Sequence, residues 1–478
     1  MGVETELKLR WAGAGTPTPQ AVAAPDWPAP RRRRLVSVYY DTPEGALWRR
    51  GVAWRVRRAG RTWLQTVKWR GEQQAAMAVR REVEVPLAGP EPAPERLPPE
   101  ARAVVAAVAG RAGPVFETRF ERWTWRLAPE PGLEVELALD LGELRAGAAR
   151  EPIAELEIEL LQGPPEGLYR VGRALAARLP LALGHASKAE RGYRLAGLAA
   201  EAPAPAPWSP PALDREADAA EAGRILTHDL ARHLDAHLEA ALAGDAEGLH
   251  QVRLALRRLR TLPRLLPVAW AEDEALADDL RALARATGPL RDLDVLGEAW
   301  GAVAARCPGL PGPGPGFETA RAEARAAARA ALGGPASARA VLGLMAAGEA
   351  ARAGPWRRHG ARVLERLHRQ VRNRGGGFAR LGPEDRHRLR IAVKRLRLAA
   401  QLVAGPEPRG RARRYLRRLT RLNEALGALQ DLAVQRGLAA RIGAGAPLCA
   451  WLEGRAEGWE AAARLAWRRW REAAPFWD

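Results

Sequence analysis

Residues 3–10 read VETELKLR, and apolar and charged side chains alternate along this stretch. A period of two residues predicts a β-strand, because successive side chains of a strand point to opposite faces. One face of this strand presents Glu4, Glu6 and Lys8, and the other presents valine and leucine. An apolar face has to pack against a core, so we expect the strand to belong to a half-buried sheet.

The same alternation recurs through the first third of the chain, interrupted by helical patterns at about 100–109 and 165–178. Eight strands with charged faces can close into a barrel whose interior is polar and whose apolar outside is covered by helices. A charged solvent face on a half-exposed sheet is the alternative interpretation. The seven further strands are expected at residues 35–40, 52–58, 62–69, 79–86, 115–126, 132–141 and 153–161.

The polar faces of these strands carry more charge than contact with water requires. Three like charges on one strand repel one another unless they are solvated or a cation lies among them. Basic rows suit phosphate oxygens, and glutamate clusters suit a hard divalent cation such as Mg²⁺. The rows are Arg55 and Arg57; Thr66 and Lys68; Glu82 and Glu84; Glu117, Arg119 and Glu121; Glu134, Glu136 and Asp140; and Glu155, Glu157 and Glu159.

The second half of the chain lacks this alternation and predicts amphipathic helices. It begins after residues 200–213, AEAPAPAPWSPPAL, which we expect to form an extended linker. Residues 249–262 and 386–399 resemble each other, which indicates an internal duplication. We therefore predict two similar helical bundles, at about 214–308 and 355–478.

Each repeated helix carries an unbroken cationic stripe beside an apolar stripe. The cationic positions recur at intervals that keep them within an arc of roughly 80° on a helix. Four cations in a row without an acidic partner are unfavourable unless they are solvated or bound to an anion. The stripes are His250, Arg253, Arg257 and Arg260 in the first repeat, and His387, Arg390, Lys394 and Arg397 in the second.

A polyanion is the expected ligand of these stripes, and it is either a phosphate chain or a nucleic acid. Proteins that bind unpaired bases usually supply aromatic platforms. Residues 249–266 and 386–403 contain no aromatic residue, which favours a bare phosphate chain. His233 and His237 stand four residues apart and resemble half a metal site, but no third ligand is evident, so core or phosphate contacts are preferred.

The composition limits the remaining classes of function. The chain of 478 residues has 75 basic and 56 acidic residues, yet only four cations are lysines, at positions 8, 68, 188 and 394. Arginine is abundant, as in proteins from GC-rich genomes, so a retained lysine marks a site that requires a compact ammonium. No run of 18 apolar residues or secretory signal is present, and Cys307 and Cys449 cannot build a disulfide framework. We expect a cytoplasmic protein.

The ordered motifs of the strand-rich half resemble the CYTH superfamily, the triphosphate tunnel metalloenzymes. The Glu-x-Glu-x-Lys pattern of residues 4–8 opens the set, and the resemblance covers nearly all of residues 1–197. Such a pattern alone is weak evidence, because any charged strand can supply it, but the ordered set is specific. The later motifs are Tyr40-Asp41-Thr42, Arg55-Val56-Arg57, Lys68, Arg81-Glu82, Glu155-Leu156-Glu157 and Ser187-Lys188-Ala189-Glu190-Arg191-Gly192-Tyr193.

This resemblance implies an eight-stranded tunnel that binds triphosphate end to end, with catalysis centred on Glu4, Glu6, Lys8 and Lys68. The residues implied to contact phosphate oxygens are Lys8, Arg55, Arg57, Lys68, Arg119 and Lys188. Those implied to hold Mg²⁺ or Mn²⁺ are Glu4, Glu6, Glu157 and Glu159. Those implied to support the ligands or to hold a second metal are Glu82, Glu121, Glu136 and Asp140. If the register of residues 115–126 slips by one, Arg122 replaces Arg119 as the inward residue.

The helical half resembles the CHAD domain over about 215–478. The likeness lies in the paired His/Arg helices and in Leu-Arg-Asp-Leu-Asp-Val, 290–295, with its weaker partner Leu-Gln-Asp-Leu-Ala-Val, 429–434. It implies that inorganic polyphosphate binds in a basic channel between the two bundles. We interpret Asp292 and Asp431 as helix caps or arginine partners.

We therefore predict an α+β multidomain protein with an antiparallel eight-stranded β tunnel at 1–199, a linker at 200–213 and an all-α duplicated helical domain at 214–478. The leading function is metal-dependent hydrolysis of inorganic triphosphate, with polyphosphate bound by the helical domain. Two alternatives stay open. In the first, the tunnel acts on an organic triphosphate such as thiamine triphosphate, or cyclises ATP. In the second, the protein is a non-catalytic polyphosphate-binding module.

Overall fold

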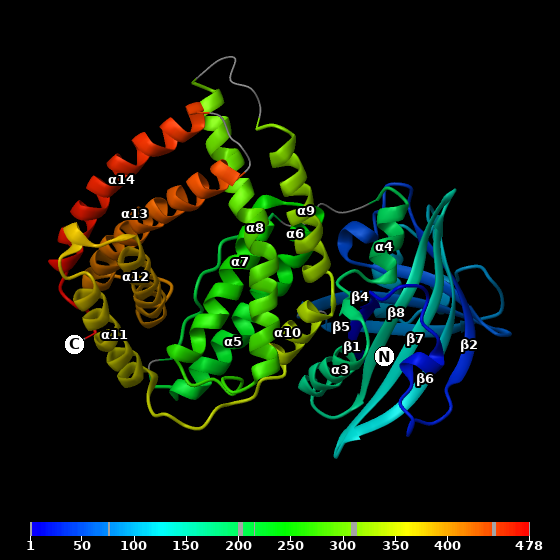
Figure 1. Cartoon of the computed structure of the whole chain (residues 1–478). Helices are drawn as coiled ribbons and strands as arrows, with labels where there is room; N and C mark the ends of the chain where they lie inside the picture. The colour runs from blue at the N-terminus through cyan, green and yellow to red at the C-terminus, as the bar shows by residue number, and fades with distance from the viewer. Residues whose placement is uncertain are drawn as a thin grey trace. The chain divides into compact units, whose positions relative to one another are not determined.

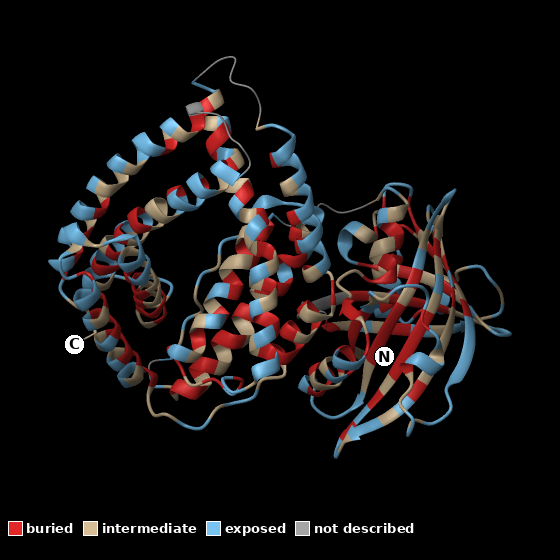
Figure 2. Ribbon diagram, in the orientation of Figure 1, coloured by how far each residue is buried: buried red, intermediate tan, exposed pale blue. Residues whose placement is uncertain are grey.

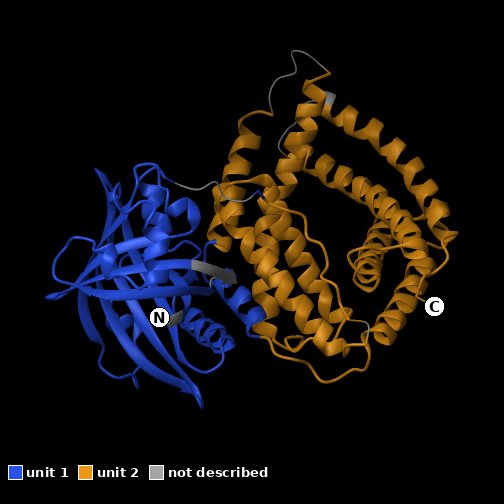
Figure 3. Cartoon of the chain, turned by 180° about the vertical axis from the view of Figure 1, so that it is seen from behind, with its two compact units in different colours: residues 1–204, 333–346 blue, residues 205–332, 347–478 orange. Residues whose placement is uncertain are grey.

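The computed structural model of the chain describes residues 2–74, 77–198, 204–214, 216–306, 313–441 and 446–477. Two compact units are distinguished in Figure 3: unit 1 is Met1–Ala204 with Gly333–Ala346, and unit 2 is Pro205–Leu332 with Ala347–Asp478. Residues 200–203 of the expected linker, and Cys307, lie outside the described residues. Residues 204–214 form neither helix nor strand.

Unit 1 is built around a closed antiparallel barrel of eight strands, which confirms the predicted fold class (Figure 1). The strands follow the order β5-β4-β3-β2-β6-β7-β8-β1, and β1 pairs with β5 to close the barrel. A short ninth strand, β9 (Leu181–Leu183), pairs with the free end of β1. The barrel strands are β1 (Gly2–Trp11), β2 (Arg31–Asp41), β3 (Ala53–Ala59), β4 (Thr62–Gln74), β5 (Met77–Leu87), β6 (Gly113–Glu130), β7 (Leu133–Ala146) and β8 (Ala149–Gln162).

Part of the outside of the barrel is apolar and is covered by a helix, because successive strand residues point alternately inward and outward. Helix α2 (Pro99–Val105) packs on a cluster that contains Trp54, Val67 and Val83. Helix α4 (Lys188–Leu195) contributes Tyr193 to a second cluster, which contains Phe116 and Phe120 and lies on the inner side of the strands. The other short elements of this unit are α1 (Pro19–Val22), η1 (Trp48–Arg50) and η2 (Pro94–Arg96).

One helix of unit 1 comes from the helical half of the sequence. Helix α10 (Pro335–Met345) packs against α3 (Glu166–Arg178) and β9, and Leu342 is fully buried there. The close approach depends on Gly172, because an added Cβ would lie 2.5 Å from Leu7 Cδ2 and 3.3 Å from Leu342 Cδ1. Truncating a buried leucine to alanine typically costs about 2–5 kcal/mol, so α10 is part of the core of unit 1.

Unit 2 is all-helical, and its order repeats: α7 is followed by the long α8, and α12 by the long α13 (Figure 1). Asp218, Asp245 and Asp273 begin α5, α7 and α8 by accepting hydrogen bonds from backbone amides of the first turn. The helices are α5 (Ala219–Ala236), α6 (Leu238–Ala243), α7 (Ala246–Thr261), α8 (Glu274–Ala304), α9 (Pro315–Leu332), α11 (Trp356–Arg374), α12 (Pro383–Ala404), α13 (Gly410–Arg441) and α14 (Ala446–Arg471), with 3-10 turns η3 (Leu262–Arg264) and η4 (Phe378–Arg380).

The burial pattern of Figure 2 follows the predicted amphipathic stripes. The predicted apolar stripe of α7, from Leu249 to Leu259, is buried, and Leu389, Val393 and Leu396 of α12 are buried as well. The cationic stripes beside them are therefore held on defined faces by the packing of each helix. Within the described parts of the chain, no helix combines the length and the apolar character needed to cross a membrane.

Candidate active site and basic channel

The interior of the barrel contains a cavity of about 360 Å³ whose lining is largely ionic. Its side chains come from seven of the eight strands and from the start of α4, because the pleat turns every second residue inward. Most of the charged residues expected on the inner faces line this cavity. Its charged lining residues are Glu4, Glu6, Lys8, Arg55, Arg57, Lys68, Arg80, Glu82, Glu84, Arg122, Glu157, Glu159 and Lys188.

The expected register of β6 was wrong by one residue. Arg119 pairs with Glu117 on the outside of the barrel, and Glu121 pairs there with Arg32. Arg122 and Phe120 line the cavity instead. The charge pattern indicated the wrong face because the inward positions before Arg122 are aromatic or neutral, while the outward ones are charged.

One end of the cavity holds three carboxylates around a single ammonium. Lys188 Nζ lies 2.6 Å from Asp140 Oδ2 and 3.0 Å from Glu157 Oε1, and it also contacts Glu155. Burial alone would lower the pKa of Lys188, but the three carboxylates raise it above its usual value. The oxygens of Asp140, Glu155 and Glu157 lie close enough together to hold a metal ion, but Lys188 already supplies the compensating charge.

Arg122 reinforces this buried network with a bidentate contact. Its Nε donates to Asp140 Oδ1 at 2.7 Å and its Nη2 to Asp140 Oδ2 at 2.6 Å, and it also contacts Glu157. Burial works against the charge of Glu157, yet Lys188, Lys8 and Arg122 hold its pKa well below the usual range. Glu157 is thus an ion-pair partner of three cations, which separates it from the other expected metal ligands.

The other two lysines of the tunnel each bridge two carboxylates. Lys8 Nζ lies 2.9 Å from Glu6 Oε1 and 3.3 Å from Glu157 Oε1. Lys68 contacts Glu4 and lies 3.1 Å from Glu82 Oε2. A compact ammonium suits these positions because it can approach oxygens from several directions at once.

The carboxylates near Glu159 are short of positive charge. Burial and, with it, the nearby carboxylates of Glu4 and Glu136 raise the pKa of Glu159 to about 7, against the opposing effect of Lys68. Oxygen donors that repel one another in a buried site fit a hard divalent cation. Among the expected metal ligands, Glu159 thus has less compensating positive charge around it than Glu157 has.

The charge of the tunnel residue Arg57 is poorly compensated. Its Nε donates to Ser37 Oγ at 3.3 Å. Burial lowers its pKa to about 10, and the positive charges of Arg55 and Arg122 contribute to the shift. Arg55 contrasts with it, because Arg55 lies 3.6 Å from Glu82 and 3.4 Å from the Tyr39 hydroxyl. A bound anion would relieve the repulsion at Arg57.

Unit 2 contains a cavity of about 470 Å³ that brings the two cationic stripes together. Helices α7 and α12 supply the stripes, and α8 and α13 supply the flanking residues. Arg397 is the one stripe residue that does not line the cavity, although its charge acts on Arg257. The seven stripe residues that do are His250, Arg253, Arg257, Arg260, His387, Arg390 and Lys394. We call this cavity the basic channel.

The basic channel holds more positive charge than its carboxylates compensate. Burial lowers the pKa of Arg257 to about 10, with Arg397 and Arg390 adding to the effect. Two acids line the channel: Asp431, 3.3 Å from Arg390 Nη2, and Asp292, which acts on Arg253 through its charge. Asp431 is thus an arginine partner, and neither aspartate lies at the start of its helix.

His233 and His237 form a structural pair. Their ring centroids lie 4.2 Å apart, and His237 Nδ1 lies 2.7 Å from the carbonyl oxygen of His233. His237 Nε2 accepts a hydrogen bond from the backbone amide of Ala206 at 3.2 Å, which fixes the segment before α5. Both imidazoles are therefore engaged in packing contacts, as preferred from the sequence.

Sequence reasoning missed several residues of the two cavities. Arg80 lines the tunnel, and its position two residues before Glu82 places it on the same strand face, so the two-residue period could have identified it. In the basic channel, Arg291 and Gln430 also line the cavity, and Gln430 Oε1 lies 2.9 Å from His387 Nδ1. These two follow from the packing of α8 and α13 against the stripes.

Comparisons with known proteins identify both parts. A CYTH domain model matches residues 3–193, and a CHAD domain model matches residues 224–440. A Haemophilus influenzae protein named inorganic triphosphatase is 28% identical over 161 residues, which are 34% of this chain and 46% of that protein. The match thus spans less than half the length of that relative.

Solved structures resemble the two halves separately. The CHAD domain from the plant Ricinus communis is 24% identical and covers 56% of this chain and 93% of its own, with a TM-score of 0.39. A candidate adenylyl cyclase from Hippeastrum, described as having a dominant triphosphatase activity, is 21% identical and covers 39% and 92%, with a TM-score of 0.30. The family matches show that the chain carries a CYTH domain at residues 3–193 followed by a CHAD domain at residues 224–440.

Proposed function

We propose that the tunnel hydrolyses inorganic triphosphate to pyrophosphate and phosphate with Mg²⁺ or Mn²⁺, and that the basic channel binds inorganic polyphosphate. The observation that supports the first part most strongly is the closed ionic cavity of about 360 Å³, in which cations from several strands surround one space. The similarity to an inorganic triphosphatase supports the same reaction.

The reaction requires little covalent chemistry from the protein. Transfer of a phosphoryl group to water depends on positioning and on neutralising charge at the equatorial and leaving oxygens. Lys8, Lys68 and Lys188 are held in place by carboxylates before substrate arrives, and Arg55, Arg57 and Arg122 extend the same lining. Cations held in this way stabilise the developing charge without reorganising.

A divalent metal ion would be held by carboxylates that line the cavity. Glu4, Glu6 and Glu159 would hold it, and Glu136 would support them by its charge. When bound, it would act as a Lewis acid and would orient the attacking water. Glu157, Asp140 and Glu155 serve instead to hold Lys188 and Arg122 in place for phosphate.

The lining favours an inorganic over an organic triphosphate. Of the two aromatic residues that line the tunnel, Tyr39 stacks on Phe116 at a centroid distance of 4.3 Å, and Phe120 lies under Lys188 at 5.0 Å. One face of each ring is thus already occupied, which leaves less aromatic surface for a base or a thiazole.

The test is phosphate release by the full chain from tripolyphosphate, ATP and thiamine triphosphate, side by side, with Mg²⁺, with Mn²⁺ and with neither. We expect tripolyphosphate to be hydrolysed fastest and only when metal is present. Faster hydrolysis of thiamine triphosphate, or formation of cyclic AMP from ATP, would assign an organic substrate. A folded chain that is inactive on all three substrates would favour the interpretation of the protein as a non-catalytic polyphosphate-binding module.

A further inference from the structure

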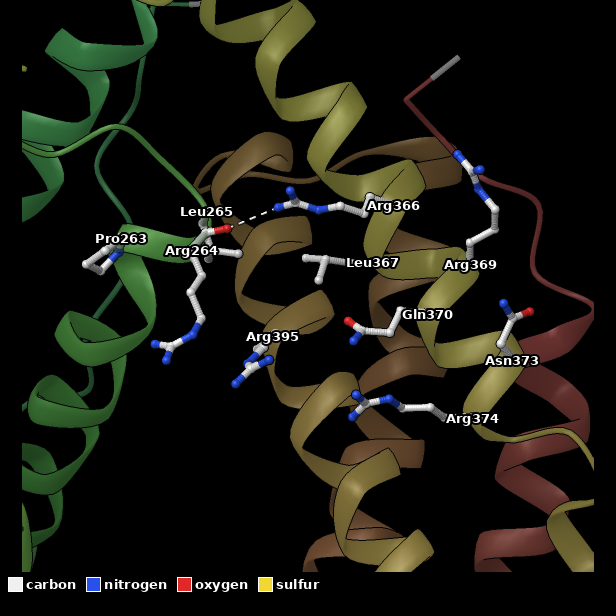
Figure 4. A pocket seen from close by; sticks show the side chains of 10 residues that line it. All are labelled: Pro263, Arg264, Leu265, Arg366, Leu367, Arg369, Gln370, Asn373, Arg374 and Arg395. Atoms are coloured by element: carbon white, nitrogen blue, oxygen red, sulfur yellow. Dashed lines mark hydrogen bonds between the residues drawn. The ribbon is translucent and has the colours of Figure 1, made fainter. Parts of the chain in front are cut away.

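Unit 2 contains a second cationic cavity, which no sequence motif indicated. It measures about 810 Å³ and lies between η3, α11 and α12. Figure 4 shows the side chains of Arg264, Arg374 and Arg395 directed toward one space, with Gln370 between them, whereas Arg369 points away. We call this cavity the arginine groove. Its lining residues are Pro263, Arg264, Leu265, Arg366, Leu367, Arg369, Gln370, Asn373, Arg374 and Arg395, with no acid among them.

Two of the guanidinium groups directed into the groove are positioned by backbone carbonyls, not by carboxylates. Arg264 Nη1 donates to the Arg260 carbonyl at 2.9 Å, and Arg374 Nη1 donates to the Arg388 carbonyl at 3.1 Å. In the described part of the chain, no carboxylate forms an ion pair with Arg264, Arg374 or Arg395. Burial lowers the pKa of Arg395, and the positive charges of Arg264 and Arg374 lower it further. The groove thus holds guanidinium groups in place while their positive charge stays uncompensated.

The groove continues the positive charge of the basic channel. Lys394 lines the channel, and the next residue of α12, Arg395, lines the groove, so the two cavities lie on neighbouring faces of one helix. Arg260 lines the channel, and Arg264 lies in the groove four residues later, hydrogen-bonded to it. The charge of Arg264 also acts on Arg260: the pKa of Arg260 is lowered by burial, by Arg281 and by Arg264.

We propose that the arginine groove is a second phosphate-chain site, and that a long polyphosphate leaving the basic channel past Arg260 continues into it. This inference rests on the proposed binding of polyphosphate in the channel. Planar guanidinium groups match phosphate oxygens in pairs, and the amides of Gln370 and Asn373 add neutral donors. The groove lining contains no aromatic residue, so it offers no platform for the bases of a nucleic acid.

Bridging the two cavities makes affinity depend on chain length. A chain held in the channel presents its next phosphates to the groove at high effective concentration, so the second contact costs little additional entropy. A chain too short to reach both cavities would lack this second contact. Longer chains should therefore gain affinity beyond what their larger number of phosphates provides, and the groove should be the source of that gain.

The experiment compares variants of the full chain in binding titrations with polyphosphates of increasing length. The groove variant carries Arg264→Gln, Arg374→Gln and Arg395→Gln, and the channel variant carries Arg253→Gln and Arg257→Gln. Arg372→Gln is the matched control, because this arginine is exposed on α11 and does not line the groove. Since Arg264 and Arg374 are exposed, their single substitutions keep the test available if the triple variant folds poorly.

We expect the groove variant to lose about tenfold or more in affinity for long chains, with a salt slope reduced by about two to three units. Its affinity for short chains should match that of the unmodified protein. Unchanged long-chain affinity in the groove variant, while the channel variant loses binding, would overturn the second site alone. Unchanged binding in the channel variant would instead overturn the proposed function. Tighter groove-dependent binding of single-stranded RNA than of polyphosphate at equal salt would overturn the ligand class.

Discussion

The cations of the tunnel and those of the basic channel lie in opposite electrostatic surroundings. In the tunnel, burial disfavours the charges of Lys8 and Lys188, yet surrounding carboxylates raise the pKa of each above its usual value. In the channel, burial lowers the pKa of Lys394 to about 7, and the neighbouring charges of Arg257 and Arg390 act in the same direction. The lysines of the tunnel are paired with carboxylates before a ligand arrives, whereas the channel lacks the negative charge that a polyanion would supply.

This difference separates a site suited to catalysis from one suited to binding. Cations fixed among carboxylates hold their geometry and need not reorganise during reaction, which is what stabilises a transition state. Cations that repel one another are stabilised most when an anion binds, and this electrostatic stabilisation depends on salt concentration more than on geometry. The following predictions test that division, from the largest expected effect to the smallest.

Removing one carboxylate from the tunnel should abolish most of the hydrolysis. Glu4→Gln removes an expected metal ligand and one of the two carboxylates that hold Lys68, so we expect kcat for tripolyphosphate to fall about 10²–10³-fold. Glu143→Gln is the matched control, because Glu143 lies outside the tunnel lining and pairs with Arg145. Equal activity of the Glu4 and Glu143 variants would contradict the assigned metal site.

Removing two cations from the basic channel should weaken long-chain polyphosphate binding. We expect Arg253→Gln with Arg257→Gln to lower affinity by more than about tenfold and to reduce the salt slope by about two units. Titrations at several salt concentrations give both quantities. If affinity fell only about twofold, the stripes would act as separate solvated faces without the avidity expected of one site.

The corrected register of β6 predicts unequal effects for two neighbouring arginines. Arg122→Gln removes a cation that lines the tunnel, so we expect kcat/KM for tripolyphosphate to fall about tenfold or more. Arg119→Gln should leave it unchanged, because Arg119 faces outward and pairs with Glu117. Thermal unfolding of both variants separates the catalytic effect from the loss of the Asp140 contact. A larger effect at Arg119 would restore the register expected from the sequence.

Polyphosphate binding should take up a fraction of a proton near neutral pH. With its pKa lowered to about 7, Lys394 is partly neutral in the free channel, and a bound anion favours its charged form. The groups that face it are Arg257, Arg390, Arg397 and Asp431. Affinity should therefore fall as the pH rises above 7. Calorimetry in buffers of different ionisation enthalpy measures the uptake, and an equal uptake in Lys394→Gln would exclude Lys394 as its source.

Alternation and helical spacing predicted most of the fold, because each reports directly which face of an element is buried. They failed for β6, where Phe116 and Phe120 point inward and the charged residues point outward. An inward aromatic residue has the same pattern as a core residue, so the phase of that strand was decided by its charges. The contact between Arg122 and Asp140 defines the inward face of β6.

Long-range packing could not be predicted from the sequence, for a different reason. The amphipathic pattern of α10 requires a partner but does not say which one, and Leu342 packs on unit 1 instead of on the helices around it in the sequence. The arginine groove combines residues from η3, α11 and α12 that share no period. For the same reason, residues 1–200 alone would lack α10, so activity measurements are better made on the full chain.

The most direct test of the division between tunnel and channel measures both functions on both variants. Tripolyphosphate hydrolysis and long-chain polyphosphate binding are determined for Glu4→Gln and for Arg253→Gln with Arg257→Gln. We predict that the first variant loses hydrolysis but keeps binding, and that the second loses binding but keeps hydrolysis. Loss of both functions in either folded variant would contradict the account, because it would mean that the two cationic sites act as one.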